Sequence, residues 1–209
     1  MRPLLFSIFY FFIFALNAKA AVSDVSNIYR ETPTLNGLDV CFGGGCAEIR
    51  HISISAQEWT QVEGVFANNS YDEKLKAAFE RKQISDAVGL LEKIVGAKIG
   101  TSGDRAGTFN NSKYPGQLDC NDEAINTTTY IRLMQYYGLI KLHEAEDMRT
   151  RSFFLNGWPH TTAVIRDKIS GDRFAVDSWF YDNGLPATVV PFDVWKSGYI
   201  PIDSPLHDH

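Results

Sequence analysis

The chain has 209 residues, of which 44% are hydrophobic and 22% charged, and its formal net charge is −5. This length suits one ordinary domain with a substantial buried core. No stretch concentrates Lys and Arg in the way that phosphate binding demands, so the composition argues against a nucleic acid partner. The sequence also has no internal repeat and no low-complexity tract. We therefore expect a single domain.

The first 20 residues have the features of a secretory signal peptide. Arg2 precedes an apolar run from Leu4 to Leu16, and the small residues Ala18 and Ala20 suit cleavage after position 20. The alternative is a transmembrane anchor, but the run is shorter than the roughly 20 residues that span a bilayer. We expect one domain at 21–209, exported to a periplasm or secreted, with no stable membrane insertion after cleavage.

The three cysteines form an odd set, which in an exported protein raises the question of which one is unpaired. Cys41 and Cys46 flank a stretch with three glycines, which lets the chain close a tight loop, so we predict a disulfide between them. Two alternatives are a metal site, for which two thiols without a nearby His are too few, and three free thiols in a reducing compartment. Cys120 is left as the free thiol.

The first predicted elements combine a strand with two helices. Residues 48–54 are typical of a short strand, and Ser55 with Glu58 forms a capping-box pattern that begins a helix ending near residue 66. A longer helix is predicted over 71–95, with Gly96 as its end. Together with the strands further along the chain, these elements predict an α+β fold.

Cys120 lies where the next helix is predicted to begin. The preceding stretch, 100–116, is rich in Gly, Ser, Thr and Asn and predicts a long surface loop, a kind of segment that is often functional. Asp119 is the predicted N-cap of a helix that runs to about Tyr137 and is closed by Gly138. Backbone N–H groups and the helix dipole favour a thiolate at Cys120. The alternative is a buried structural cysteine.

Two strand-like runs around a polar turn at 167–172 predict a β-hairpin. A loop of two or four residues places His160 and Asp177 on the same face of this hairpin. A loop centred between positions 168 and 169 makes them direct partners, whereas a loop centred two residues later puts Asp177 opposite Val164. A base oriented by a carboxylate, next to a spare thiol, is the set of groups that thiol catalysis needs.

Cys120, His160 and Asp177 together resemble the transglutaminase-like superfamily, in which a Cys at a helix N-terminus is followed by His and Asp on adjacent strands. The motifs that carry the resemblance are residues 118–124, 160–164 and 175–179, and the matching core covers roughly 117–180. The chain looks most like the bacterial transglutaminase-like cysteine proteinases, which are exported. The resemblance implies a papain/transglutaminase-like core, in which the helix carrying the Cys packs on an antiparallel sheet carrying the His and Asp.

The resemblance also implies a mechanism. Cys120 attacks a carbonyl carbon, His160 shuttles the proton, and an acyl-enzyme is released to water or to an amine. A peptidase or amide hydrolase acting on a protein or peptide is the first expectation. The alternatives are a cross-linking acyltransferase and a non-catalytic binding member of the same fold. The backbone N–H of Cys120 would bind the oxyanion, with Gln117 and Trp158 as candidates for a second donor.

Acidic residues crowd the nucleophile, and negative charge disfavours a thiolate. One resolution is that Asp119 caps the helix while Asp122 and Glu123 point into solvent. The other is a bound Ca²⁺, as the resemblance implies for some bacterial members. Asp119 and Asp122 occupy matching places, Asn121 stands where an acid would strengthen the match, and the loop at 100–116 would have to add oxygens. No other cofactor is expected.

Overall fold

The structure is a computed structural model that describes residues 31–68, 72, 75–108, 114–152 and 159–208. The predicted signal peptide, residues 1–20, and the oxyanion candidate Trp158 lie outside the described residues. None of the helices in the described part of the chain is long and apolar enough to cross a membrane.

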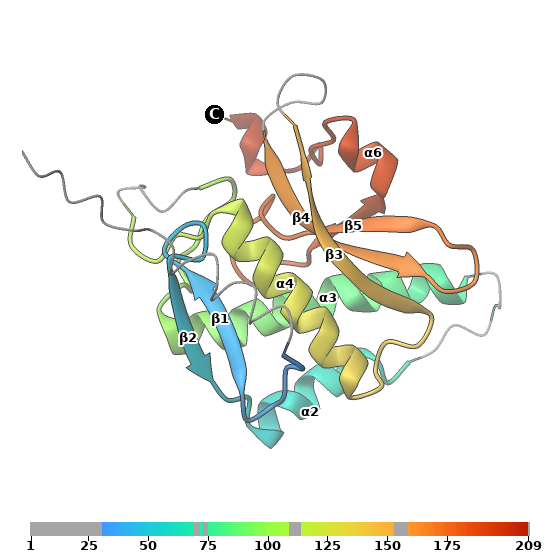
Figure 1. The fold of residues 1–209 in the computed structure, drawn as a ribbon, viewed down its shortest axis with the longest axis horizontal. Coiled ribbons are helices and arrows are strands. Elements are labelled where there is room, and N and C mark those ends of the chain that lie inside the picture. The colour runs from blue at the N-terminus through green and yellow to red at the C-terminus, as the bar shows by residue number, and fades with distance from the viewer. Residues whose placement is uncertain (1–30, 69–71, 73–74, 109–113, 153–158, 209) are drawn as a thin grey trace, which may run out of the picture.

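Helices and antiparallel strands mix along the chain, which confirms the α+β class (Figure 1). The elements in chain order are β1 (Leu38–Phe42), β2 (Glu48–Ile52), α2 (Ala56–Val65), α3 (Lys76–Ile99), α4 (Cys120–Tyr136), β3 (His143–Arg151), β4 (His160–Asp167), β5 (Arg173–Asp177), β6 (Thr188–Pro191), α6 (Phe192–Lys196) and a 3₁₀ turn, η1 (Pro205–Asp208).

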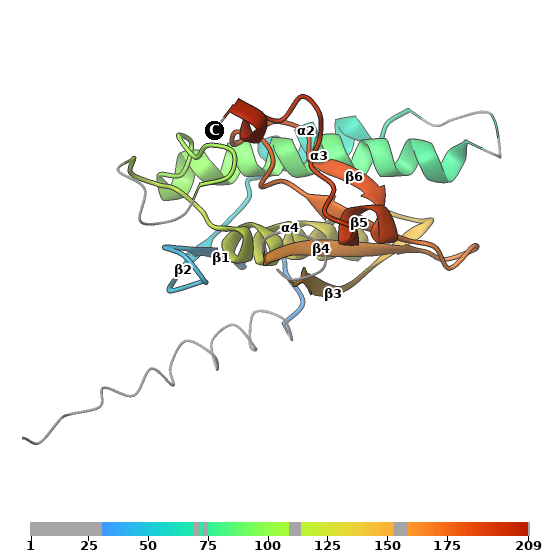
Figure 2. The ribbon, with the colours of Figure 1, turned by 90° about the horizontal axis from the view of Figure 1, so that it is seen from above.

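Helix α4 lies between two antiparallel sheets. Strands β1 and β2 form a two-stranded hairpin, and the other four strands form a sheet in the order β3-β4-β5-β6. The helix contacts β1 as well as β3 and β4. Helix α3 crosses it in Figure 1, and Figure 2 shows the two helices in separate layers. Because α4 begins at Cys120, these contacts position the thiol.

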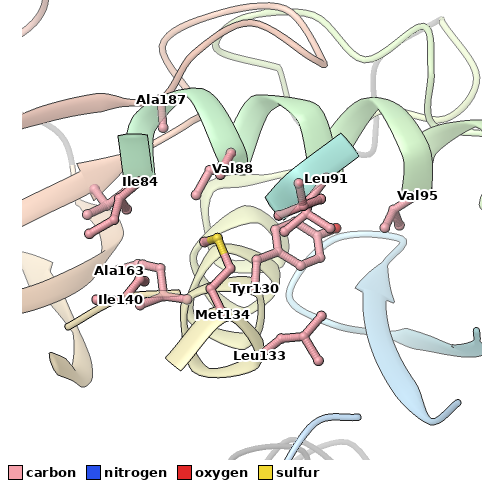
Figure 3. Packing of buried hydrophobic residues seen from close by; sticks show 14 of the residues in the cluster. Ile84, Val88, Leu91, Val95, Tyr130, Leu133, Met134, Ile140, Ala163 and Ala187 are labelled. Carbon is pink, nitrogen blue, oxygen red and sulfur yellow. The ribbon is translucent and has the colours of Figure 1, made fainter. Parts of the chain in front are cut away.

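The main core forms where α3 crosses α4. Figure 3 shows Val88, Leu91 and Val95 of α3 facing Tyr130 and Met134 of α4. Each of these side chains is at most 2% exposed. Burying a side chain of this size contributes about 1.5–3 kcal/mol. The core therefore holds α4 firmly along its length.

Local sequence decides where two of the helices begin. Ser55 and Glu58 make the predicted capping box at the start of α2. The side chain of Asp119 accepts from two backbone N–H groups in the first turn of α4, so the predicted N-cap is confirmed. Beyond the end of α4, Gly138 takes the positive φ of 73° that stops the helix.

The predicted bounds of α3 were wrong at both ends. The helix begins at Lys76 instead of residue 71, and it continues through Gly96 to Ile99, where Gly100 is the left-handed C-cap with φ 87°. Gly96 has a packing role instead: a Cβ there would lie 3.0 Å from Oδ1 of Asn183. A glycine inside a helix can thus mark close approach of another segment.

Candidate active site

The hairpin that carries His160 and Asp177 has a register that neither proposed loop position predicted. Strand β4 pairs with β5 so that Ala163 lies opposite Val176. The N–H of Asp167 donates to the carbonyl of Asp172, which leaves a four-residue loop. His160 and Asp177 still share a face, as predicted, but they are diagonal neighbours instead of direct partners. Diagonal neighbours about 7–8 Å apart remain within reach of long side chains.

A short hydrogen bond joins the two side chains. Nε2 of His160 lies 2.7 Å from Oδ2 of Asp177, and each residue is 2% exposed. The same carboxylate oxygen accepts from Nε1 of Trp195, in α6, at 2.6 Å. Aromatic rings also enclose the imidazole, with centroids of Trp179 and Trp195 at 4.7 and 5.8 Å. The position and orientation of the His160 ring are therefore fixed. Sequence reasoning missed Trp195, because nothing local connects it to the hairpin.

Cys120 is the free cysteine of the chain. Cys41 and Cys46 form the predicted disulfide, with Cα atoms 4.6 Å apart. Cys120 is buried, with 7% of its surface exposed, and is the first residue of α4. The first N–H groups of a helix lack partners within the helix, and the positive end of its dipole lies there. The thiol therefore stands where a negative charge is favoured.

The electrostatics of His160 link it to this thiol. Burial lowers the pKa of His160, but the charge and hydrogen bond of Asp177 and the adjacent Cys120 together raise it to about 9. Nδ1, the ring nitrogen that Asp177 does not use, is buried without a hydrogen bond of normal geometry among the described residues. Catalytic contacts are often long before substrate binds. A histidine that keeps its proton at neutral pH can hold a neighbouring cysteine as thiolate.

The prediction that Asp122 and Glu123 point into solvent is wrong, because they are 0% and 6% exposed. Burial, with the charge of Asp119 adding to it, raises the pKa of Asp122 to about 6. Burial also raises the pKa of Glu123 well above its usual range, and the charges of Glu92 and Asp104 act in the same direction. Burial therefore favours the protonated form of Glu123, which does not oppose a thiolate.

The disulfide loop supplies the partners for the other two acids. The N–H groups of Gly44 and Cys46 donate to Asp122 at 2.7 and 2.6 Å, and the N–H of Gly45 donates to Asp119 at 2.8 Å. Three successive backbone dipoles therefore offset negative charge beside the thiol. The glycines visible in the sequence allow this geometry, since Gly44 and Gly45 both have positive φ.

These hydrogen bonds occupy the oxygens that a calcium ion would need. Calcium takes about six to eight oxygen ligands, yet both oxygens of Asp119 and both of Asp122 accept from backbone N–H groups. Asp104, from the preceding loop, accepts from the N–H of Leu118 at 2.9 Å. Within the described ranges there is no group of three or more His, Cys, Asp or Glu residues placed to hold a metal. The side chains in this arrangement do not fit the expected calcium site.

Gln117 holds the loop in front of α4. It is 4% exposed, and its Nε2 donates to the carbonyls of Gly103 at 2.9 Å and Pro115 at 3.2 Å. Its Oε1 accepts from the N–H of Arg105 at 3.1 Å. Both amide hydrogens are therefore used within the loop, and this geometry does not support a role in binding an oxyanion.

A group of buried carboxyls includes Glu123, in the first turn of the helix that begins at Cys120. Glu92 of α3, Asp104 and Glu123 are each at most 7% exposed. The hydroxyl of Ser178, the residue after Asp177, donates to Glu123 at 2.9 Å. Burial is the main reason that the pKa of Glu92 rises to about 7, and it also raises the pKa of Asp104. Near neutral pH these carboxyls therefore hold protons in the folded chain, and they release those protons when the chain unfolds.

We expect the free energy of unfolding to fall as pH rises from about 5 to 7. Between its usual pKa and its folded pKa of about 7, Glu92 is protonated when folded and ionised when unfolded, so the unfolded chain binds fewer protons. Each such group lowers the free energy by up to about 1.4 kcal/mol per pH unit. Urea unfolding at several pH values measures this slope. Glu92→Gln should flatten it, whereas Glu63→Gln, at an exposed position on α2, should not. Equal slopes in both variants would contradict the assignment to Glu92.

Comparison of the chain with models of known protein families, with curated proteins and with solved structures gave no match.

Proposed function

We propose that this protein is a cysteine hydrolase of the transglutaminase-like type, which cleaves an amide bond in a protein or peptide through Cys120, His160 and Asp177. The observation that carries the proposal is the buried hydrogen bond between His160 and Asp177, beside a free thiol at a helix start. The packing of α4 against β3 and β4 supports a papain/transglutaminase-like core. The intact set of nucleophile, base and orienting carboxylate favours an enzyme over a binding member of the fold.

The proposed reaction proceeds through a thioester. The Cys120 thiolate attacks the carbonyl carbon, and as the C–N bond breaks, the leaving amine takes the proton from His160. Water, which gives a proton back to His160, then attacks the thioester and releases the acid together with the thiolate. Asp177 holds the imidazole in the required tautomer and stabilises its charged form. The backbone N–H of Cys120 stabilises the oxyanion.

An acyltransferase is the second candidate, because it passes through the same thioester and differs only in the group that attacks it. The two reactions are separated by product analysis with and without an added amine. A new amide product that replaces the free acid would identify a transferase. If the added amine only slows formation of the free acid and no new amide appears, the protein is a hydrolase.

We also propose that the protein is exported. The disulfide between Cys41 and Cys46 suits an oxidising compartment, in which such bonds form and persist. Cleavage after Ala20 is the matching expectation for the N-terminus. Mass spectrometry of the N-terminal peptide from the host, after fractionation of cells and medium, tests both points.

Alkylation with iodoacetamide without reductant, followed by mass spectrometry, tests the proposed function. We expect label on Cys120 alone, recovery of a peptide pair linked through Cys41 and Cys46, and rapid labelling at pH 6, where an ordinary thiol with a pKa near 8.5 reacts slowly. Cys120→Ser is the control. A Cys120 that reacts only after denaturation would favour the non-catalytic binding member instead.

The same assay tests the calcium hypothesis, which the side-chain arrangement around Asp119 and Asp122 does not support. It is run in chelator, in millimolar calcium and in millimolar magnesium, together with a melting curve. Faster labelling and a higher melting temperature in calcium alone would support the hypothesis. Equal values in all three conditions would remove calcium from the mechanism.

A further inference from the structure

Arg151 lies in the same row of side chains as His160 and Asp177. It is the last residue of β3, 5% exposed, and directly opposite His160 in the antiparallel register. Directly opposite residues in neighbouring strands share a face, and the register of β4 with β5 places Asp177 on that face as well. Three neighbouring strands therefore contribute an arginine, a histidine and an aspartate to one side of the sheet.

Two backbone carbonyls and an aromatic ring hold the guanidinium of Arg151. Its Nη1 donates to the carbonyls of Trp195 at 2.6 Å and Tyr199 at 3.0 Å. Its Cζ lies 4.9 Å from the centre of the Trp195 ring, and the Nε1 of that ring donates to Asp177. The Nε of Arg151 is buried without a hydrogen-bond partner in the described part of the chain. The cation is thus fixed in position by neutral groups.

The charges near Arg151 belong to the proposed site. Burial lowers the pKa of Arg151, and the negative charges of Asp177 and Cys120 oppose this effect. A buried ion costs several kcal/mol unless opposite charge compensates it. With Cys120 as thiolate and Asp177 ionised, the site holds two anions, and His160 and Arg151 provide two cations. These four groups therefore balance in charge, while the backbone N–H groups of the disulfide loop offset the charges of Asp119 and Asp122.

We propose that Arg151 is a positioning residue of this site, whose permanent positive charge keeps Cys120 in the thiolate form. The inference rests on the proposed function. His160 gives its proton to the leaving group during each turnover, so its charge alternates. A guanidinium does not lose its proton in proteins. Arg151 therefore maintains a positive potential when His160 is neutral, which favours return of the thiolate as the thioester breaks down.

The rate of Cys120 alkylation across pH 5–9, measured on the full chain, tests this inference. Arg151→Gln removes the charge but keeps a donor for a carbonyl, and Arg151→Lys keeps the charge. In Arg151→Gln we expect the pH at which the labelling rate reaches half its maximum to rise by about one unit, and the rate at pH 6 to fall about tenfold. Because the charge is the proposed cause, Arg151→Lys should stay within about threefold of wild type, and the exposed control Arg149→Gln should not change.

A folded Arg151→Gln protein with the wild-type pH profile would overturn the inference. A folded Arg151→Lys protein that has lost the wild-type profile would also overturn it, because the contacts and not the charge would then matter. Should Arg151→Gln fail to fold, Arg151→Lys decides: a wild-type profile supports the charge, and a lost profile overturns it. An unreactive Cys120 in the wild type would instead contradict the proposed function.

Discussion

His160→Ala should reduce the alkylation rate of Cys120 at pH 6 by about 100-fold and, once a substrate is known, should reduce turnover by about 1000-fold. The imidazole interacts with Cys120 and has a pKa raised to about 9, so it is a cation beside the thiol at pH 6. Without it the thiol lacks the neighbouring cation that stabilises a thiolate, and the leaving amine has no proton donor. Alkylation stopped at several times and pH values measures the change in labelling rate. Product formation from the substrate measures the change in turnover.

The surface pair of His51 and Asp39 offers a matched control for this experiment. Nδ1 of His51 lies 2.8 Å from Oδ1 of Asp39, a distance close to the 2.7 Å between His160 and Asp177. This pair joins strands β1 and β2, however, and 68% of the His51 side chain is exposed. His51→Ala should leave the alkylation rate unchanged. A folded His160→Ala protein that reacts at the rate of His51→Ala would remove His160 from the mechanism.

Substitutions of Asp177 and Cys120 test the other two residues of the proposed catalytic set. Cys120→Ala should abolish turnover, whereas Asp177→Ala should have the mildest effect of the three, because Asp177 orients the imidazole and does not react. Asp177 also accepts from Trp195, so Asp177→Asn, which preserves the shape, is the better probe of charge. Melting curves show whether each variant is folded.

Asp122→Ala should lower the free energy of unfolding by about 3 kcal/mol, which corresponds to a decrease of roughly 10 °C in melting temperature. The change leaves the N–H groups of Gly44 and Cys46 without the acceptors that they reach at 2.7 and 2.6 Å. The start of α4 would lose its attachment to the disulfide loop, so we also expect slower alkylation of Cys120. Asp147→Ala, at an exposed acid on β3, is the control.

Removal of the disulfide by substitution of both cysteines provides an independent test of this attachment. The loop is short, so its closure entropy is small, and the bond acts chiefly by holding the loop against Asp122. Asp122→Ala combined with Cys41→Ser and Cys46→Ser should therefore destabilise by less than the separate losses added together. Fully additive losses would show that the loop and the carboxylate act independently.

Local sequence was sufficient for the features that depend on residues a few positions apart. Asp119 caps α4 and places Cys120 first in the helix, as predicted, because an N-cap acts on N–H groups two and three residues away. Three glycines allow the loop that Cys41 and Cys46 close. The period of two in a strand put His160 and Asp177 on one face even though the predicted register was wrong.

The rest was decided by contacts between distant segments. Strand β3 is rich in charged residues and was not predicted, since pairing with β4 and not local hydrophobicity makes it a strand. The acids beside Cys120 were expected in solvent, but a loop 76 residues away in sequence buries Asp122. Trp195 and Arg151 reach the site only when α6 and β3 pack around β4 and β5. Hydrogen bonds and burial between residues this far apart in sequence exist only once the chain has folded, so no local pattern predicts them.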